Sequence, residues 1–396
     1  MVKTFVVKDT IASSSPSEIF PIISDFRHGR FLKMPPHIYS CESSTVGSLR
    51  FIKLGKQQVC ERVVMNNPKT FTFGYEFDFQ QGNSFDGVLD MYVAVITLHP
   101  SGDSGTTMKF TITYNPVCDA EGEEKFKSNM TKNYLQWIAN AGEMAAKSTV
   151  KYELNTDTEV PVGILRMDDG KMNAFGFDLC GDLDKALDIA EQDESKAIII
   201  CGNKKAFSAG FDLSVMGSTD PKLATTKAKL LERGGMVVMR TYAFPKPVIL
   251  AVTGHALALG AIMLFAGDLR IGPNEVQGQK TAKIGMNEVA IGMTLPDFAI
   301  QLAKARIPVT ELTQALGQAK VYTPVSASNM GYLDAVAATN SYDDVIALAL
   351  AEGRRLGGYV TQPAFARQKM LERGDIYNNV MAGMRSNGIA DPMANL

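Results

Sequence analysis

The chain has 396 residues, more than one hydrophobic core usually organises, so two domains are expected. Hydrophobic residues make up 45% and charged residues 21%, which is typical of a globular protein. The formal net charge of −2 provides no basic field, so the sequence does not indicate nucleic-acid binding. The five cysteines form no CxxC pair and the histidines are scattered, so the sequence shows no metal-binding spacing. The odd number of cysteines favours free thiols. No apolar run approaches the ~18 residues of a membrane span.

Residues 1–147 are predicted to form a first domain, in which strands precede one long helix. Residues 3–8 predict a strand, and the run Ser15-Pro16-Ser17-Glu18 marks the start of a helix. Turn residues then separate five predicted strands, at 49–52, 60–64, 70–77, 91–98 and 107–114. A helix over 121–146 carries apolar residues at helical spacing: Phe126, Met130, Tyr134, Trp137 and Ile138.

This pattern, with Ser17-Glu18-Ile19-Phe20 and Ser24-Asp25-Phe26, resembles the START/Bet v 1 (SRPBCC) helix-grip fold of the α+β class. The resemblance implies that the domain holds an apolar ligand between its sheet and its helix. The alternative is that strand aromatics such as Phe73, Tyr75 and Phe77 form an ordinary core. The segment contains no paired acid and base and no metal-ligand cluster, so it is not expected to perform chemistry.

Residues 148–396 are predicted to form a second domain, of the α/β class. Residues 148–158 combine a linker with a first strand, and further strands are predicted at 160–167, 197–202, 248–252 and 268–271. A helix over 177–191 lies between two of these strands, as in a βαβ unit. After Leu295 the sequence is predicted to be helical, over 298–305, 309–317 and 342–356.

Two small-residue stretches follow buried strands in this second domain. Residues 206–213 (Ala-Phe-Ser-Ala-Gly-Phe-Asp-Leu) follow the strand at 197–202, and residues 253–261 follow the strand at 248–252. Small side chains leave backbone N–H groups free to face an oxygen that gains negative charge. A helix that starts near Gly260 would add the positive end of its dipole. The sequence therefore predicts one site that receives an amide from each stretch.

Residues 206–213, 254–268 and 284–292 resemble the crotonase superfamily of enoyl-CoA hydratases and isomerases. The first stretch meets the pattern Ala-Phe-x-Ala-Gly-x-Asp-Leu in full, whereas Ala258 and Leu259 replace two glycines of the second pattern. The resemblance extends from about Val150 to about Arg373. It implies an α/β spiral core (ClpP-like) with a helical C-terminal region through which trimers, or hexamers made of trimers, assemble.

The resemblance also implies roles for individual residues. The oxyanion-hole amides would be those of Phe211 and Leu259, and the catalytic carboxylate would be Glu288. Apolar neighbours should raise the pKa of Glu288, and Leu259 is expected to crowd the pocket. Hydratases of the family use a second glutamate, and its position here is Ile262. Residues implied in substrate binding are Ala209, Gly210, Asp212, Leu213 and Gly260. Asp212 and Asp268 are expected to fix the backbone rather than to react, and His255 is expected to be a packing residue.

One carboxylate with an oxyanion hole predicts a Δ3-Δ2-enoyl-CoA isomerase, which acts on a coenzyme A thioester without a separate cofactor. Two alternatives stay open: an enoyl-CoA hydratase or another CoA-thioester reaction, and an apolar-ligand-binding protein built on a crotonase scaffold. The cytoplasm is the expected location. The final residues Ala394-Asn395-Leu396 only loosely resemble the peroxisomal import tripeptide, because Asn395 stands where a basic residue is expected.

Overall fold

The computed structural model describes residues 1–12, 14–24, 38–41, 46–54, 57–67, 69–81, 85, 87–102 and 105–385. The chain forms two compact units, Met1–Ser148 and Thr149–Leu396, and the predicted boundary lies one residue earlier. Asp25, Phe26 and the final tripeptide, on which two expectations rest, lie outside the described residues. Within those residues, no helix combines the length and apolar character needed to cross a membrane.

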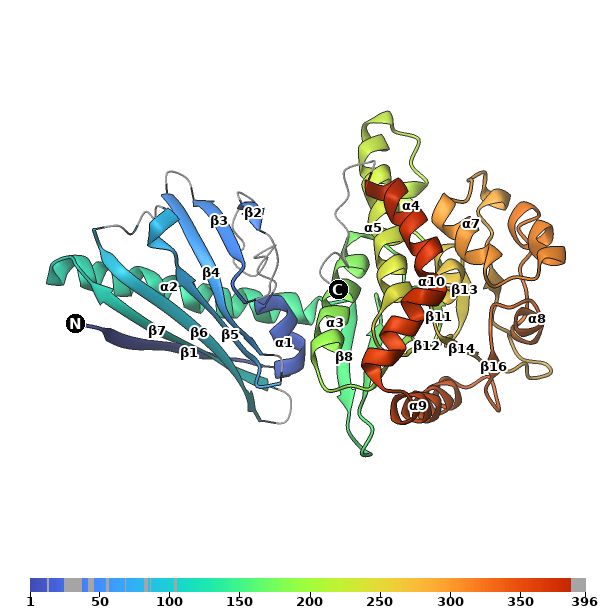
Figure 1. Cartoon of the computed structure of the whole chain (residues 1–396), viewed down its shortest axis with the longest axis horizontal. Helices are drawn as coiled ribbons and strands as arrows, with labels where there is room; N and C mark the ends of the chain where they lie inside the picture. The colour runs from blue at the N-terminus through green and yellow to red at the C-terminus, as the bar shows by residue number, and fades with distance from the viewer. Residues whose placement is uncertain are drawn as a thin grey trace. The chain divides into compact units, whose positions relative to one another are not determined.

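The first unit is a seven-stranded antiparallel sheet with the order β1-β7-β6-β5-β4-β3-β2, beside the long helix α2 (Figure 1). Its helices are α1 (Pro16–Ile23), which Ser15 and Glu18 cap, η2 (Phe79–Gln81) and α2 (Ala120–Ala146). The predicted strands are present, most of them longer than expected, whereas β2 was not predicted. The strands are β1 (Lys3–Ile11), β2 (Ile38–Cys41), β3 (Leu49–Leu54), β4 (Gln57–Asn67), β5 (Thr72–Phe77), β6 (Leu89–Ser101) and β7 (Gly105–Pro116).

Aromatic side chains form much of the core between this sheet and α2. The ring of Phe110 stacks on Tyr134 of α2 with centroids 4.2 Å apart, and Phe77 stacks on Tyr92 at 4.0 Å. The hydroxyl of Tyr134 meets those of Tyr75 and Tyr92, so the buried polar atoms of these tyrosines are paired with one another. These contacts fit the interpretation of the strand aromatics as core, and ligand binding by this unit stays a prediction.

The second unit is built on a six-stranded sheet with the order β16-β14-β12-β10-β9-β8, parallel except for the β8–β9 pair. Both faces are covered, because Ile198 and Ile200 of β10 belong to one apolar cluster while Ile199 belongs to another. Helix α3 contacts β8 and β9, and α9 contacts β10 and β12. The strands are β8 (Val150–Asn155), β9 (Val162–Met167), β10 (Ala197–Cys201), β12 (Val248–Ala251), β14 (Leu269–Gly272) and β16 (Ala335–Val336).

A second, three-stranded parallel sheet lies in the same unit, in the order β11-β13-β15. It was not predicted, because its strands are only two or three residues long: β11 (Ala206–Ser208), β13 (His255–Leu257) and β15 (Ile284–Gly285).

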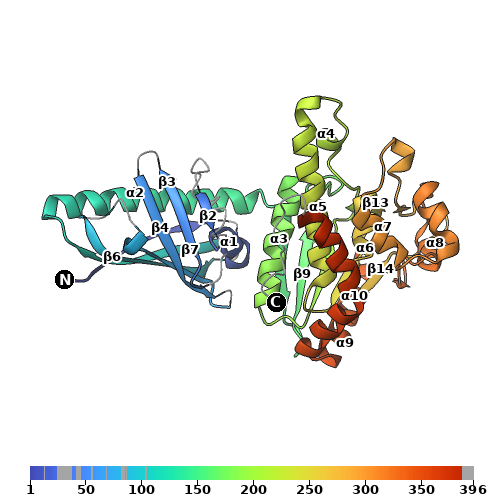
Figure 2. The ribbon, with the colours of Figure 1, turned by 45° about the horizontal axis from the view of Figure 1, so that its top comes forward.

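Helices make up the rest of the unit, and α10 runs beside α5 (Figure 2). Helices α5 and α10 were not predicted from the sequence, and the predicted helix over 309–317 consists of two short pieces, η5 and a π-helical turn, η6. The helices are α3 (Phe177–Gln192), α4 (Leu213–Met216), η3 (Pro221–Leu223), α5 (Ala224–Ala243), α6 (Leu259–Leu264), η4 (Val289–Ile291), α7 (Asp297–Lys304), η5 (Val309–Glu311), η6 (Thr313–Gly317), α8 (Pro324–Asn329), α9 (Tyr342–Tyr359) and α10 (Gln362–Arg385).

Candidate active site

The three short strands β11, β13 and β15 bring the three motif stretches to one edge of the small sheet. The strands are parallel, and the register pairs Ser208 with Ala256 and Leu257 with Gly285. Because parallel strands end at the same edge, the residues that follow them converge. A methyl group placed on Gly210 would lie 3.2 Å from the backbone nitrogen of Leu259. The first two stretches are therefore in direct contact.

The first predicted oxyanion-hole amide is that of Phe211. The N–H of Phe175 donates to the carbonyl of Gly210 at 2.8 Å, and the N–H of Asp212 donates to the carbonyl of Phe175 at 3.2 Å. In this parallel bridge the intervening N–H of Phe211 points away from Phe175. It has no acceptor within the part of the chain that the structure describes. Gly210 has a φ of 95°, which favours glycine.

The second predicted amide is that of Leu259, the first residue of α6. Its N–H belongs to the first turn, where helices leave backbone donors unpaired, and it finds no acceptor among the described residues. The strained residue is Ala258, with φ 50° and ψ −125°, a conformation that glycine adopts freely. The side chain of Leu259 is fully buried in the core, against Gly234 of α5. Gly234 leaves room for this side chain, and the expectation that Leu259 crowds the pocket stays a prediction.

Glu288 follows β15 and is 7% exposed. Its Oε2 atom is buried with no hydrogen-bond partner, and its carboxyl forms no ion pair within the described residues. Burial raises the pKa of Glu288 from 4.5 to about 7. A carboxyl group with this pKa can accept and return a proton near neutral pH. The geometry therefore fits a proton carrier better than a salt-bridged structural glutamate.

Other unpaired polar atoms lie near Glu288. Among the described residues, Asn287 Oδ1 and the Tyr332 hydroxyl are buried without a hydrogen-bond partner. Tyr332 is fully buried beside Phe265, and this burial raises the pKa of its hydroxyl, with smaller contributions from Tyr322 and Glu288. Unpaired buried atoms of this kind mark a place for water or for the polar group of a ligand. Ile262, at the position of the second family glutamate, is fully buried on α6.

The other predicted residues surround the two amides. The N–H of Ala209 donates to the carbonyl of Met172 at 2.9 Å, and a methyl group on Gly260 would meet the carbonyl of Ser208 at 2.5 Å. Asp212 caps α4 by accepting from the N–H of Ser214, and Leu213, which begins α4, is 61% exposed.

His255, which was expected to be a packing residue, makes a hydrogen bond to the backbone. Its Nδ1 accepts from the N–H of Lys283 at 3.0 Å, which connects β13 to the segment that leads into β15.

Sequence reasoning missed two side chains that hold the first stretch in place. The Asn173 side chain donates to the carbonyls of Ala206 at 3.0 Å and Phe207 at 3.1 Å. The Ser208 hydroxyl donates to the carbonyl of Asn173 at 2.6 Å and accepts from the N–H of Gly210 at 3.1 Å. The sequence contained one indication of this role, because the turn residues Asp169, Gly170 and Asn173 follow a predicted strand.

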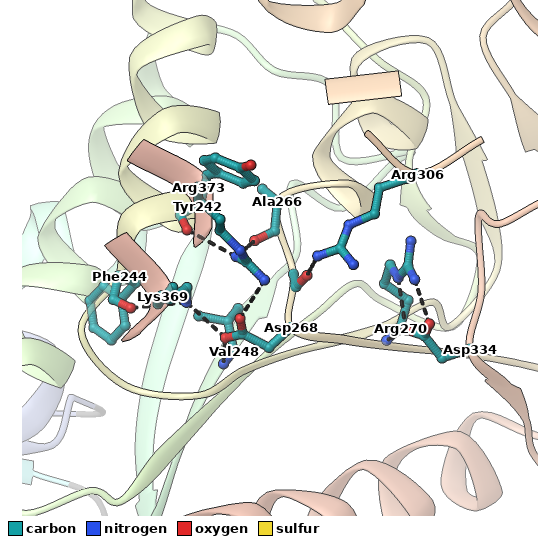
Figure 3. Close-up of polar contacts among 11 residues, drawn as sticks. Tyr242, Phe244, Val248, Ala266, Asp268, Arg270, Arg306, Asp334, Lys369 and Arg373 are labelled. Carbon is teal, nitrogen blue, oxygen red and sulfur yellow. Dashed lines mark hydrogen bonds and ion pairs between the residues drawn. The ribbon is translucent and has the colours of Figure 1, made fainter. Parts of the chain in front are cut away.

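Asp268 has a structural role, as expected, and is shown in Figure 3. Its two oxygens accept hydrogen bonds from Arg373 and Lys369 of α10, each at 2.7 Å. Asp268 Oδ2 also accepts from the N–H of Val248, the first residue of β12, at 2.7 Å. The carboxylate therefore connects α10 to the start of β12. Over the described residues, no cluster of His, Cys, Asp and Glu is arranged to hold a metal ion.

Comparisons with known proteins agree with this architecture. The family model described as enoyl-CoA hydratase/isomerase matches residues 157–356, half of the chain. A probable enoyl-CoA hydratase of Bacillus subtilis (strain 168) is 34% identical over 143 residues, which are 35% of this chain and 50% of that protein. The probable enoyl-CoA hydratase EchA17 of Mycobacterium tuberculosis (strain H37Rv) is 28% identical over 43% of this chain and 60% of that protein. The chain thus spans about half to three-fifths of the length of these curated relatives.

Two solved structures are also similar to the chain. Enoyl-CoA hydratase EchA3 of Mycobacterium ulcerans Agy99 aligns with a TM-score of 0.53 and 34% identity, over 60% of this chain and 96% of that one. An apo structure titled as an enoyl-CoA isomerase of Mtb aligns with a TM-score of 0.53 and 33% identity, over the same shares of the two chains. Because the family model covers half of its residues, the chain belongs to the enoyl-CoA hydratase/isomerase family.

Proposed function

We propose that the chain is a Δ3-Δ2-enoyl-CoA isomerase. The observation that carries the proposal is the buried carboxyl of Glu288, whose Oε2 has no partner, at the sheet edge where the N–H groups of Phe211 and Leu259 also find no acceptor among the described residues. A thioester oxygen that gains negative charge needs two such donors, and each is worth about 3–4 kcal/mol in a water-poor site. The named isomerase among the similar structures is consistent with this activity.

The reaction needs only one proton carrier. The Glu288 carboxylate removes a proton from C2 of a 3-enoyl-CoA, and the C–H electrons form a dienolate whose oxygen accepts from Phe211 and Leu259. The protonated Glu288 then returns the proton to C4, which leaves the double bond between C2 and C3. The pKa of about 7 suits both steps, because neither protonation state is strongly favoured at neutral pH. The coenzyme A thioester is the substrate, and no separate cofactor takes part.

Hydration is the second candidate, because the curated relatives quoted above are named hydratases. In the family, hydration uses a second glutamate, at the position that Ile262 occupies in this chain. Ile262 cannot transfer a proton and is fully buried. Isomerisation therefore agrees better with the groups that are present.

Product analysis in heavy water separates the two candidates. We expect 3-enoyl-CoA to give 2-enoyl-CoA, and 2-enoyl-CoA to give little 3-hydroxyacyl-CoA by mass spectrometry. Glu288→Gln should lower the isomerisation rate by about 10³-fold or more, since the proton carrier is lost. Glu352→Gln, which changes a glutamate paired with Arg355, is the control and should keep the rate. Rapid formation of the hydroxy product by the unchanged chain would overturn the proposal.

The same products test why hydration should be slow. Ile262→Glu places a carboxyl at the missing position, and we expect it to raise the rate of hydration. If the rate does not rise, the missing acid is not what limits hydration.

For the first unit we propose a helix-grip, START-like fold that holds an apolar ligand for delivery or selection. The antiparallel sheet with its single long helix α2 supports the proposal. We expect the full chain to bind a fluorescent fatty acid and residues 149–396 alone to bind it more weakly. Equal binding by both would contradict the proposal and favour a structural brace.

We further propose a homotrimer, or a pair of trimers, located in the cytoplasm. The proposal rests on the family resemblance and on the helical C-terminal region, α9 and α10. Light scattering at micromolar concentration should give a mass of three or six chains, and a stable monomer would refute it. A tagged chain should stay in the cytoplasm whether or not its last three residues are deleted.

A further inference from the structure

Helix α5 carries two adjacent glycines, Gly234 and Gly235, in its buried part. A glycine inside a helix lowers stability relative to alanine, so a pair of them points to close approach of other groups. The two glycines face different neighbours. Gly235 faces Met384 of α10 and Phe298 of α7, whereas Gly234 faces Phe211 and Leu259.

The contacts at Gly234 leave no space for a side chain. A methyl group there would lie 2.5 Å from Cε1 and 2.7 Å from Cζ of Phe211, and 3.0 Å from Cδ2 of Leu259. Non-bonded carbon atoms pack at about 3.5–4.0 Å. The Phe211 ring and the Leu259 side chain therefore meet on the bare backbone of Gly234.

These two side chains belong to the two residues whose backbone N–H groups find no acceptor in the described part of the chain. Leu259 is fully buried, so its side chain has no solvent into which it could move. The preceding residue, Ala258, already has a strained backbone, and its Cβ would lie 2.6 Å from a methyl group on Gly210. A displacement of the Leu259 side chain would therefore be passed to the backbone that carries the amides, and the half-buried Phe211 ring would have to shift at the same glycine.

We infer that Gly234 is a positioning residue for the proposed oxyanion hole. Because it has no side chain, Phe211 and Leu259 can both pack against its backbone, and this shared contact sets the spacing of their N–H groups. The inference rests on the proposed function for its catalytic consequence, because it assumes that the two amides bind the thioester oxygen. The packing of Phe211 and Leu259 against Gly234 does not depend on any reaction.

The matched pair Gly234→Ala and Gly235→Ala in the full chain tests the inference. Both changes replace a buried glycine of the same helix by a better helix former. At Gly235 the nearest atom is the flexible end of Met384, at 2.7 Å, which can move. We expect Gly234→Ala to lower kcat for isomerisation at least tenfold with a smaller change in KM, because oxyanion donors act mainly in the transition state. Gly235→Ala should keep kcat within about twofold.

A second change tests whether the loss comes from the contact itself. Phe211→Leu removes the two ring atoms that the new methyl group would meet and keeps the backbone N–H. We expect Gly234→Ala with Phe211→Leu to recover part of the kcat that Gly234→Ala loses, whereas Gly235→Ala with Phe211→Leu should be additive. Additive effects in both cycles would overturn the inference.

A readout without turnover separates this inference from the proposed function. In protein labelled with ¹⁵N at Phe and Leu, the amide signals of both Phe211 and Leu259 should shift in Gly234→Ala and stay in place in Gly235→Ala. If the unchanged chain does not isomerise 3-enoyl-CoA but these signals shift as expected, the proposed function fails, whereas the packing of both residues against Gly234 is confirmed. If the chain is active and the signals do not respond to Gly234→Ala, the inference alone fails.

Discussion

The ionised carboxylate of Glu288 destabilises the folded chain because it is buried. Its burial can therefore be measured without substrate, through the pH dependence of the free energy of unfolding. Its pKa is about 7 in the folded chain against 4.5 ordinarily. Below pH 4.5 the carboxyl is protonated in both states and costs nothing. As the pH rises to 7 the unfolded chain releases the proton while the folded chain keeps it, so stability falls, and above 7 the loss is constant.

We therefore expect Glu288→Gln to raise the free energy of unfolding. This increase should be larger at pH 8 than at pH 4, by up to about 3 kcal/mol. Denaturant titrations at the two pH values measure the difference. Glu352→Gln, with its carboxyl at the surface, should show no comparable dependence on pH. An equal effect of Glu288→Gln at both pH values would mean that the carboxyl is solvated.

Ala258 holds a backbone conformation that suits glycine, with φ 50°. Such strain costs about 1–3 kcal/mol, while glycine loses about 0.5–1 kcal/mol of chain entropy on folding, so Ala258→Gly should stabilise the fold by about 1 kcal/mol. Ala261→Gly, inside the short helix α6 that Ala258 precedes and without a positive φ, should instead destabilise the fold by about 1 kcal/mol. Thermal and denaturant unfolding would measure both, and changes of the same sign would contradict the strain.

At the scale of elements, the small sheet explains how weak local signals give an ordered site. Strands β11, β13 and β15 are too short to be stable alone. They are held by pairing with one another and by contacts such as the Asn173 side chain on Ala206 and Phe207. The resulting edge brings residues 210–211, 258–259 and 286–288 to the end of adjacent strands.

Helix α10 depends on one carboxylate for its attachment to β12. Asp268→Asn would leave Lys369 and Arg373, both buried, without a carboxylate, and breaking a buried ion pair costs about 3–5 kcal/mol. We expect this loss in the free energy of unfolding of the C-terminal unit. Adding Lys369→Met and Arg373→Met to Asp268→Asn should recover part of it, because the two cations that lost their carboxylate are then gone.

A matched pair at the surface provides the comparison. Glu352→Gln removes the carboxylate from the exposed pair with Arg355 and should cost less than about 1 kcal/mol. If Asp268→Asn costs no more than this surface change, the two cations are solvated and the carboxylate does not secure α10.

At the scale of the whole molecule, each unit has an apolar core of its own. The clusters around Tyr92 and Tyr134 lie within residues 1–148, and those around Ile199 and Leu250 lie within residues 149–396. All residues that the proposed reaction uses belong to the second unit. We expect the fragment 149–396 to fold and to isomerise a short 3-enoyl-CoA with a kcat/KM within about threefold of that of the full chain.

Circular dichroism and the same product assay would check this expectation. A fragment that folds but loses activity would show that the first unit contributes to the reaction. A fragment that does not fold would show that the two cores are not independent.

The sequence by itself determined the local structure and the family. The continuous apolar run of β10, the Ser15–Glu18 cap and the helical spacing in α2 depend on neighbours a few residues away, so each could be predicted from the chain alone. The motif stretch 206–213 and Glu288 could be identified in the same way, because residue type and order carry that signal.

Only the tertiary structure decided how these parts meet. The contact of Gly210 with Leu259 depends on the pairing of strands about 50 residues apart, and the pKa of Glu288 depends on how completely distant segments exclude water from its carboxyl. The role of Gly234 could not be predicted from the sequence, because it depends on which side chains pack against the glycine backbone. Local spacing sets backbone conformation, whereas burial and close contact arise from packing between segments that are remote in the chain.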